Sequence, residues 1–163
     1  MLQDSAFIVD DSGHVTSFGG QIAFPAAQVA SADVNVLDDY QEGTFTPTLT
    51  GSVVPTYTGG TLLGRYVKIG NHVFASVWIT GVTITGSGGG QARIGGFPFS
   101  AAATNVHTSS VDVATAAAFS VLPTALYMRG GAAVASLIDV ALTAPTWNVV
   151  AGVNVCFQVF YMI

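Results

Sequence analysis

Two β-prone runs separated by a two-residue turn constrain the fold of this chain more than any other feature. The runs are Leu62–Ile69 and His72–Thr80, and Gly70 and Asn71 between them can supply the positive φ of a tight hairpin turn. In the second run, both faces of the strand carry apolar bulk. The pattern predicts an antiparallel hairpin whose second strand is covered on both sides, with Trp78 in the core.

The rest of the chain repeats this pattern of short apolar runs and turn residues. Only Asp112–Phe119 keeps a helical period, and it is long enough for a short helix at most. Further β-prone runs are Thr44–Thr50, Gln91–Ile94, Asn105–Val113, Ala118–Leu122, Ala125–Met128, Ala133–Ile138 and Val153–Ile163. Many short strands with turn signals between them predict an all-β fold, an antiparallel β-sandwich or jelly roll. The last run is apolar on both faces, which indicates a central strand or one at a subunit interface.

The N-terminal forty residues have a different organisation. At Phe7–Phe18 the sequence FIVDDSGHVTSF places a turn-forming Asp-Ser-Gly between two short β-prone runs, which predicts a tight hairpin. Residues Gly19–Asp39 keep neither a helical nor a strand period, which indicates an extended connector. We therefore divide the chain into an N-terminal shaft with a hairpin and connector, residues 1–37, and a head domain, residues 38–163.

Charged residues are scarce, and this limits the partners that the chain can have. Only 8% of residues are Asp, Glu, Lys or Arg, compared with about 25% in an ordinary soluble domain. We expect much of this uncharged surface to be buried between identical subunits; the alternative is a β-surface coated with Ser and Thr in water. The net charge is −5 and the four cations are scattered, so nucleic-acid binding is not expected.

Membrane insertion is not expected either. No uninterrupted apolar run approaches the ~20 residues that span a bilayer, and the N-terminus lacks a basic region followed by an apolar core. The single cysteine, Cys156, lies in an apolar run and is predicted to be a small buried hydrophobic residue.

The segment Gly20–Leu49 is a specific string. It begins with GQIAFPA and ends with LDDYQEGTFTPTL, and it resembles the join between shaft and head in bacteriophage tail-fibre and related virion fibre proteins. The similarity extends to GRYVKIGN at Gly64–Asn71 and to GFPF at Gly96–Phe99, and it is weak after that. The chain departs from the common pattern at Phe45, where the family often has Trp, and at Gln41, where Glu is frequent.

The resemblance implies a structural virion protein. We expect a homotrimer, assembled in the host cytoplasm and placed on the exterior of the phage particle. It would be a tail-fibre or tail-tip component, joined to other virion proteins through its N-terminal segment, that attaches the phage to a host-surface glycan or protein. One alternative is a capsid-decorating or head-fibre protein with a mechanical or adhesive role. A polysaccharide depolymerase is a further alternative that the sequence does not favour.

Candidate catalytic groups are few. Glycoside hydrolysis needs two carboxylates facing each other across the bond, whereas the pairs Asp10-Asp11 and Asp38-Asp39 are adjacent and point to opposite faces of an extended strand. The three histidines have no metal-binding spacing, and no serine lies in a Gly-x-Ser-x-Gly elbow. We therefore expect no enzymatic activity, no cofactor and no metal.

Receptor binding is assigned to loops and to the aromatic or polar side chains that hold sugars. The Gly-rich stretch from Ser87 to Arg93 is the main candidate, because a flexible tip can conform to a partner. The predicted receptor-binding residues are Ser87, Gly88, Gln91, Arg93, Arg129, Trp147 and Asn148. Each also has a structural interpretation: Trp147 as a core residue, and the arginines as partners of local acids.

Overall fold

The computed structural model describes residues 7–9, 15–17, 39–103, 108–113, 118–138 and 144–163. The chain divides into two compact units, Met1–Asp39 and Tyr40–Ile163, which we describe separately. The elements in the described ranges are all β-strands and pair antiparallel, which confirms the predicted all-β class. These ranges contain no helix long and apolar enough to cross a membrane.

The N-terminal unit contains the predicted hairpin. Its strands, β1 (Phe7–Val9) and β2 (Val15–Ser17), pair antiparallel with Ile8 opposite Thr16. The turn between them lies outside the described residues, and so does the predicted connector except for its last residue, Asp39.

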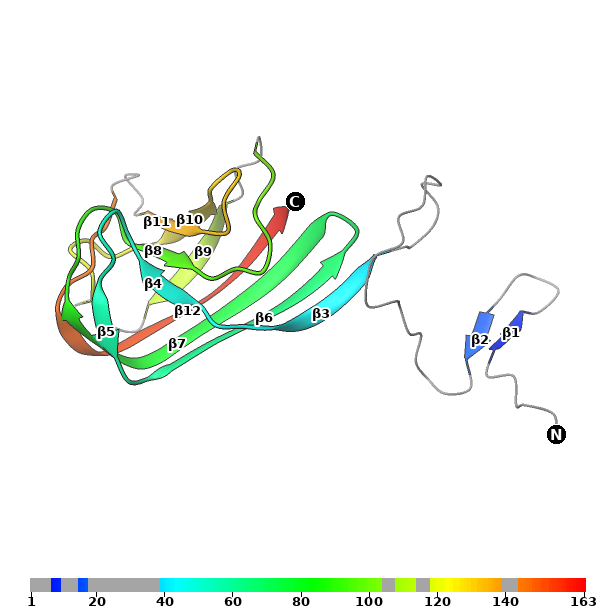
Figure 1. Ribbon diagram of the computed structural model, residues 1–163, viewed down its shortest axis with the longest axis horizontal. Coiled ribbons are helices and arrows are strands. Elements are labelled where there is room, and N and C mark those ends of the chain that lie inside the picture. The colour runs from blue at the N-terminus through cyan, green and yellow to red at the C-terminus, as the bar shows by residue number, and fades with distance from the viewer. Residues whose placement is uncertain (1–6, 10–14, 18–38, 104–107, 114–117, 139–143) are drawn as a thin grey trace. The chain divides into compact units, whose positions relative to one another are not determined.

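The C-terminal unit forms one ten-stranded sheet (Figure 1). The strand order is β3-β6-β7-β12-β9-β10-β11-β8-β4, and β5 pairs with β7 off this path. The strands are β3 (Tyr40–Phe45), β4 (Thr48–Thr50), β5 (Thr56–Thr58), β6 (Thr61–Ile69), β7 (His72–Gly86), β8 (Arg93–Gly95), β9 (Thr108–Val113), β10 (Ala125–Met128), β11 (Ala135–Ile138) and β12 (Val150–Met162). Figure 1 shows the short strands β4, β8, β10 and β11 on one side of the long strands β6, β7 and β12.

The predicted hairpin around Gly70 is confirmed. β6 and β7 pair from Thr61 opposite Thr80 to Ile69 opposite His72, and Gly70 has the expected positive φ of 57°. β7 continues past its predicted end at Thr80, because its second half pairs with β5 on one side and with β12 on the other. The long strands β6, β7 and β12 thus form a continuous antiparallel layer.

The core lies between the long and the short strands. Along β7, Val73, Val77 and Ile79 are buried while the alternate side chains face outward, and β12 alternates in the same way. The same buried cluster contains residues from every short strand of the opposite group, among them Leu49, Ile94, Leu126 and Leu137. Full burial of a side chain of this size stabilises the fold by about 1.5–3 kcal/mol.

Two predicted strands were wrong in part. Thr44–Thr50 is interrupted at Thr46 and Pro47, and its halves, β3 and β4, lie at opposite ends of the sheet order. Proline has no N–H to donate, so the ladder does not continue through Pro47. Ala118–Leu122 forms no strand: Phe119 makes an isolated bridge with Trp147, and the next residues turn away toward solvent.

Gly64 marks a close approach between β6 and an aromatic ring. A Cβ at this position would collide with the ring of Phe45, which packs on Phe97 with a centroid distance of 5.3 Å. We expect Gly64→Ala to lower the free energy of unfolding by about 1–3 kcal/mol, because the Phe45 ring must leave its place. Urea denaturation measures the change. Gly89→Ala, where a Cβ meets only ordinary contacts, is the control; equal losses in the two variants would contradict this packing.

Tyr161 supplies a pH-dependent contribution to stability. Its side chain is fully buried, and its hydroxyl donates a hydrogen bond to the carbonyl oxygen of Phe99 over 3.2 Å. Burial raises the pKa of the Tyr161 phenol above its usual value. A raised folded-state pKa means that the contribution is fully present below the unfolded pKa of about 10 and is lost as pH rises beyond it.

Replacing Tyr161 with phenylalanine tests this contribution. We expect Tyr161→Phe to cost about 1 kcal/mol at neutral pH through the lost hydrogen bond. Because the variant has no phenol to ionise, it should lose less stability than the wild type between about pH 9 and about pH 11. Urea denaturation across this range measures both effects. A difference between the two proteins that does not change with pH would argue against a buried neutral phenol.

Candidate functional site

The side of β6, β7 and β12 that faces away from the core carries large side chains that no described segment covers. We call this surface the outer face. Its residues are Leu63, Arg65, Val67 and Ile69 from β6, His72, Phe74, Ser76 and Trp78 from β7, and Cys156, Gln158, Phe160 and Met162 from β12. Strand alternation forces these positions outward, because their neighbours along each strand point into the core.

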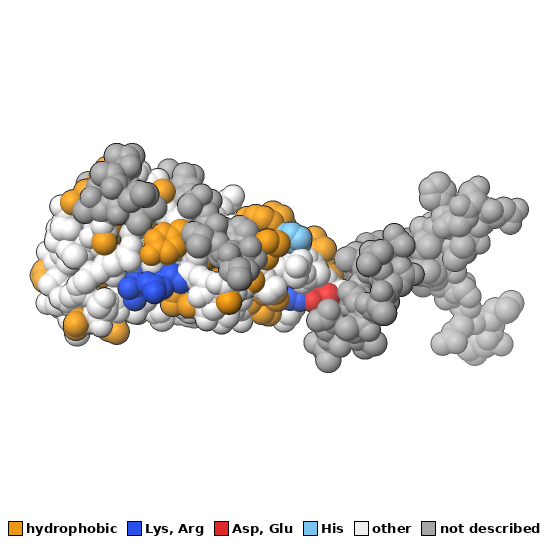
Figure 2. Space-filling model, turned by 90° about the horizontal axis from the view of Figure 1, so that it is seen from above, with side chains coloured by type: hydrophobic (Ala, Val, Ile, Leu, Met, Phe, Trp, Pro, Cys, Tyr) orange, Lys and Arg blue, Asp and Glu red, His pale blue; other side chains and the backbone are white. Residues whose placement is uncertain are grey.

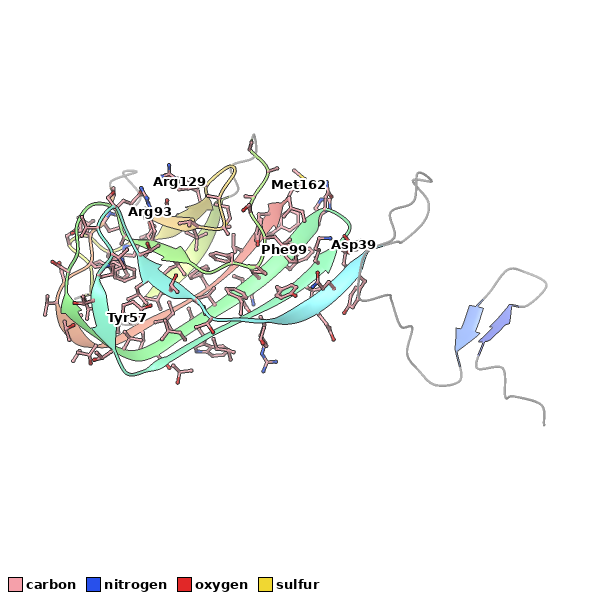
Figure 3. All side chains as sticks on the ribbon, in the orientation of Figure 1. Asp39, Tyr57, Arg93, Phe99, Arg129 and Met162 are labelled. Carbon is pink, nitrogen blue, oxygen red and sulfur yellow. The ribbon has the colours of Figure 1, made fainter. Side chains whose placement is uncertain are left out.

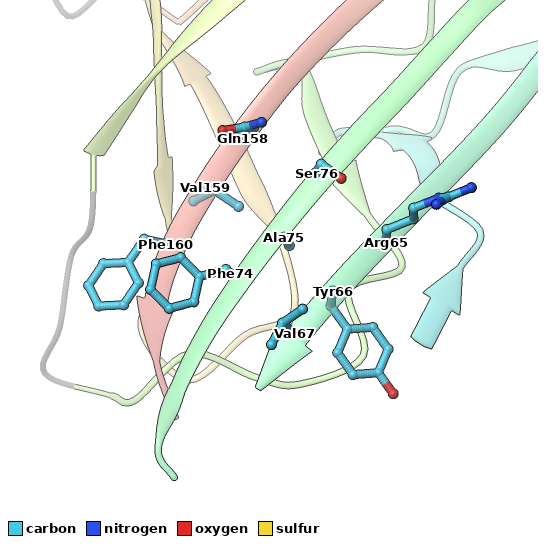
Figure 4. A pocket seen from close by; sticks show the side chains of 9 residues that line it. All are labelled: Arg65, Tyr66, Val67, Phe74, Ala75, Ser76, Gln158, Val159 and Phe160. Atoms are coloured by element: carbon cyan, nitrogen blue, oxygen red, sulfur yellow. The ribbon is translucent and has the colours of Figure 1, made fainter. Parts of the chain in front are cut away.

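The strand register arranges the outer face in rows that run across the strands (Figure 4). A polar row contains Arg65, Ser76 and Gln158. The row on one side of it is apolar and contains Val67, Phe74 and Phe160. The row on the other side contains Leu63, Trp78 and Cys156. A band of hydrogen-bonding groups therefore lies between two apolar bands.

The apolar rows are well exposed. Trp78 has 60% of its surface exposed and Phe74 has 53%. Phe160 packs against Phe74 with ring centroids 4.9 Å apart, and it also stacks on His72 at 5.3 Å. These contacts hold the rings as a platform on the sheet. The sequence-based placement of Trp78 in the core is wrong: its strand is covered on the side of Val77 and Ile79 and left open on the side of Trp78.

Two depressions follow these rows. The larger one, of about 450 Å³, is lined by residues of the polar and Phe74 rows and by their strand neighbours Tyr66, Ala75 and Val159. The smaller one, of about 310 Å³, is lined by Leu63, Arg65, Ser76 and Trp78. Both are open hollows of the sheet surface, so their shape suits protruding side chains of a second surface.

The charges near the outer face are sparse and of both signs. Arg65 is exposed in the polar row, and Glu42 on β3 lies opposite Val67 in the strand register. Glu42 accepts a hydrogen bond of 2.8 Å from the Tyr40 hydroxyl, and this bond raises the pKa of the Tyr40 phenol. Within the described part of the chain, no three His, Cys, Asp or Glu side chains form a metal-binding group. The outer face thus offers apolar contact and hydrogen bonds.

The predicted receptor loop is partly tied to the body of the domain. Ser87 and Gly88 follow β7, and the next residue, Gly89, forms a bridge with Val53. A Cβ at Gly88 would collide with the Val53 carbonyl oxygen, so glycine is required at this approach. Gln91 is half-buried, and its side-chain amide donates to the Leu137 carbonyl oxygen over 3.0 Å. This hydrogen bond occupies one of the two N–H donors of the Gln91 side chain inside the protein, so that donor does not face a receptor.

Neither Trp147 nor Asn148 belongs to the outer face, and Trp147 is buried. It is 2% exposed, its indole N–H donates to the Thr50 carbonyl oxygen over 2.8 Å, and it packs on Phe119 with a centroid distance of 4.8 Å. Asn148 is half-buried, and its backbone N–H donates to the Ala118 carbonyl oxygen. This arrangement agrees with the structural interpretation of Trp147.

The structure brings two of the predicted residues together. Arg93 on β8 and Arg129 after β10 both lie on the side of the short strands that faces away from the core (Figure 3). The outer-face residues Phe74, Phe160 and Trp78 were not among the residues predicted to form a binding site. The alternation of residues along the strand places Phe74, Ser76 and Trp78 on the same side. It does not say which side of the sheet other segments cover.

Comparison of the chain with protein-family models, with curated proteins and with solved structures finds no match. The resemblance to phage fibre proteins therefore stays an expectation from the strings at Gly20–Leu49, Gly64–Asn71 and Gly96–Phe99.

Proposed function

We propose that this chain is a subunit of a homotrimeric phage fibre or tail-tip protein that attaches the virion to the host surface. The observation that carries the proposal is the uncovered apolar outer face. The chain is poor in charge, so this face is better explained by subunit assembly than by exposure to water. The virion role itself rests on the resemblance to fibre proteins.

The apolar area of the outer face exceeds what scattered surface residues produce. From the exposed fractions of Phe74, Trp78 and Phe160, these rings alone leave on the order of 300 Å² in contact with water. A contiguous apolar patch of about 300–600 Å² is the largest on a typical monomer, and such patches are often functional. Neighbouring strands lie about 4.8 Å apart and residues rise about 3.4 Å along a strand. With β3 included, the outer face therefore has a projected area of roughly 500 Å². This is the scale of the ~800 Å² of accessible surface that each partner buries in a stable interface.

A second copy of the chain is the occupant that fits best. Among the described side chains, the face carries Arg65 and Glu42, which have opposite charges, so a neighbouring copy presents a complementary pair. The hollows beside Phe74 and Trp78 suit apolar side chains of the same kind. A head that packs three such faces around one axis would leave its loops at the periphery for a host ligand.

The organisation of both units supports the fibre reading. The strands on either side of the core suit a β-sandwich or jelly-roll-like head. The isolated hairpin of β1 and β2 buries too little to be stable alone, and winding with two further copies would cover it. A capsid-decorating or head-fibre protein would use the same interface and is the second candidate.

Cryo-electron microscopy of purified phage particles that carry this protein tests the virion role. Trimers that project from the tail tip or baseplate are the expected result. If trimers are found on capsid threefold positions, the proposed trimer is correct, but the protein decorates the capsid and does not attach the phage to the host. The absence of the protein from the particles would overturn the proposal.

A further inference from the structure

Two arginines lie on the outward side of the short strands, away from the outer face. Arg93 on β8 pairs with Ser136 on β11, and Ser136 pairs in turn with Tyr127 on β10. Arg129 follows β10, and its backbone N–H donates to the Val134 carbonyl oxygen. Their neighbours Ile94 and Met128 point into the core, so both arginine side chains point outward.

The two guanidinium groups can converge on one ligand group. Arg93 and Arg129 are two strands and two residues apart, which corresponds to about 12 Å between their Cα atoms. Figure 2 shows Lys and Arg side chains gathered in one patch on this side of the domain, and Figure 3 labels both arginines there. Because arginine side chains are long, both can reach a group that sits between them.

No described carboxylate neutralises this pair. Among the side chains that the structure describes, the acidic ones are Asp39 and Glu42, at the start of β3. Glu42 lies on β3, which pairs with the long strand β6, and Figure 1 shows the long strands on the other side of the core from β10 and β11. Residues 40–163 contain all four cations and three of the nine acids of the chain, so their formal charge is 4 − 3 = +1. An anionic ligand is therefore not repelled by this unit as a whole.

The site also has polar atoms without partners. The Arg93 Nε and the Ser136 Oγ are buried and have no hydrogen-bond partner, and Ser136 is 0% exposed. Buried polar groups in folded proteins are nearly always paired, so these two atoms indicate a missing partner in this part of the structure. The Nε–H is one of the donors of the planar fork with which an arginine binds a carboxylate or a phosphate.

We propose that Arg93 and Arg129 bind an anionic substituent of a surface glycan, the carboxylate of an acidic sugar or a phosphate group. The half-buried ring of Tyr127, two strands from Arg93 on the same side, offers an apolar surface to the adjoining sugar. The proposal that the anion belongs to a surface glycan rests on the proposed attachment function. The proposal that the two arginines bind an anionic group does not depend on that function. This site lies apart from the outer face, so assembly leaves it accessible.

Calorimetric titration of the full chain tests the site with three probes: an oligogalacturonate, a glycerol-phosphate oligomer and a neutral dextran oligomer. We expect the protein to bind at least one of the acidic probes and not the dextran. The acidic probe that binds identifies the ligand as carboxylate or phosphate. Arg93→Gln and Arg129→Gln should each weaken binding at least about tenfold, the loss of one charge-assisted hydrogen bond.

Gln41→Glu is the matched control, because it lowers the net charge by the same one unit at an exposed residue of β3 that does not belong to the outer face. It should change binding less than about twofold once long-range charge effects are screened by salt. Equal weakening by all three substitutions, or no binding of either acidic probe, would overturn the site. Arg129 is exposed at a turn, so its variant should fold even if Arg93→Gln does not. The virion location is measured separately: binding by a protein absent from particles would leave this inference standing without the attachment role.

Discussion

Replacing Phe74 with glutamate is expected to convert the assembled protein into a monomer. Phe74 lies in the centre of an apolar row of the outer face, between Val67 and Phe160, and is 53% exposed in the single chain. In an assembly, the substitution removes a buried aromatic ring and adds a carboxylate without a partner. Central aromatic residues of interfaces cost about 2–4 kcal/mol or more when they are lost, and the buried charge adds to this cost. Size-exclusion chromatography with light scattering measures the molar mass.

Val149→Glu is the control for this experiment. Val149 is also an exposed large apolar residue, but it does not belong to the outer face. The control should keep the mass of the wild type. The folding stability of the Phe74→Glu monomer should change by only about 0.5 kcal/mol, because Phe74 is exposed in the single chain. Assembly of Phe74→Glu equal to that of the wild type would exclude the outer face as the subunit interface.

Replacing Trp147 with alanine is expected to lower the free energy of unfolding by about 3–5 kcal/mol. Trp147 is fully packed, and the loss of its ring leaves a cavity beside Phe119. It also leaves the Thr50 carbonyl oxygen without its donor. Urea denaturation of the Phe74→Glu monomer with and without this substitution measures the change free of assembly effects.

The other tryptophan gives the matched comparison. In the same monomeric background, Trp78→Ala should change stability by only about 0.5 kcal/mol, because most of the Trp78 ring is in solvent. Trp147→Phe keeps an aromatic ring but loses the hydrogen bond and part of the packing, so its cost should be about 1–3 kcal/mol, less than that of Trp147→Ala. If both Trp→Ala substitutions cost the same, the assignment of one tryptophan to the core and the other to the outer face is wrong.

Local signals in the sequence predicted the strands well. The hairpin at Gly70 and Asn71 was predictable because a two-residue turn fixes the register of both flanking strands. Ala125–Met128 was also found with its bounds, as β10. The three-residue strand β5, Thr56–Thr58, was missed because a short polar strand has no apolar period to detect.

Non-local pairings decided what the sequence could not predict. Trp78 and Trp147 both lie in β-prone surroundings, and only the position of the opposite strands buries one and exposes the other. The neighbourhood of Arg93 and Arg129 depends on the pairing of β8 with β11, whose partners are more than forty residues apart in sequence. Alternation identifies the residues that share a side of a strand, but it does not say what covers that side.

The molar mass of the purified 163-residue chain at low micromolar concentration shows whether the outer face is a subunit interface. We expect three times the chain mass of 16.7 kDa, about 50 kDa, by light scattering. A mass near 16.7 kDa across the same concentrations would contradict it, because the outer face would then remain in water.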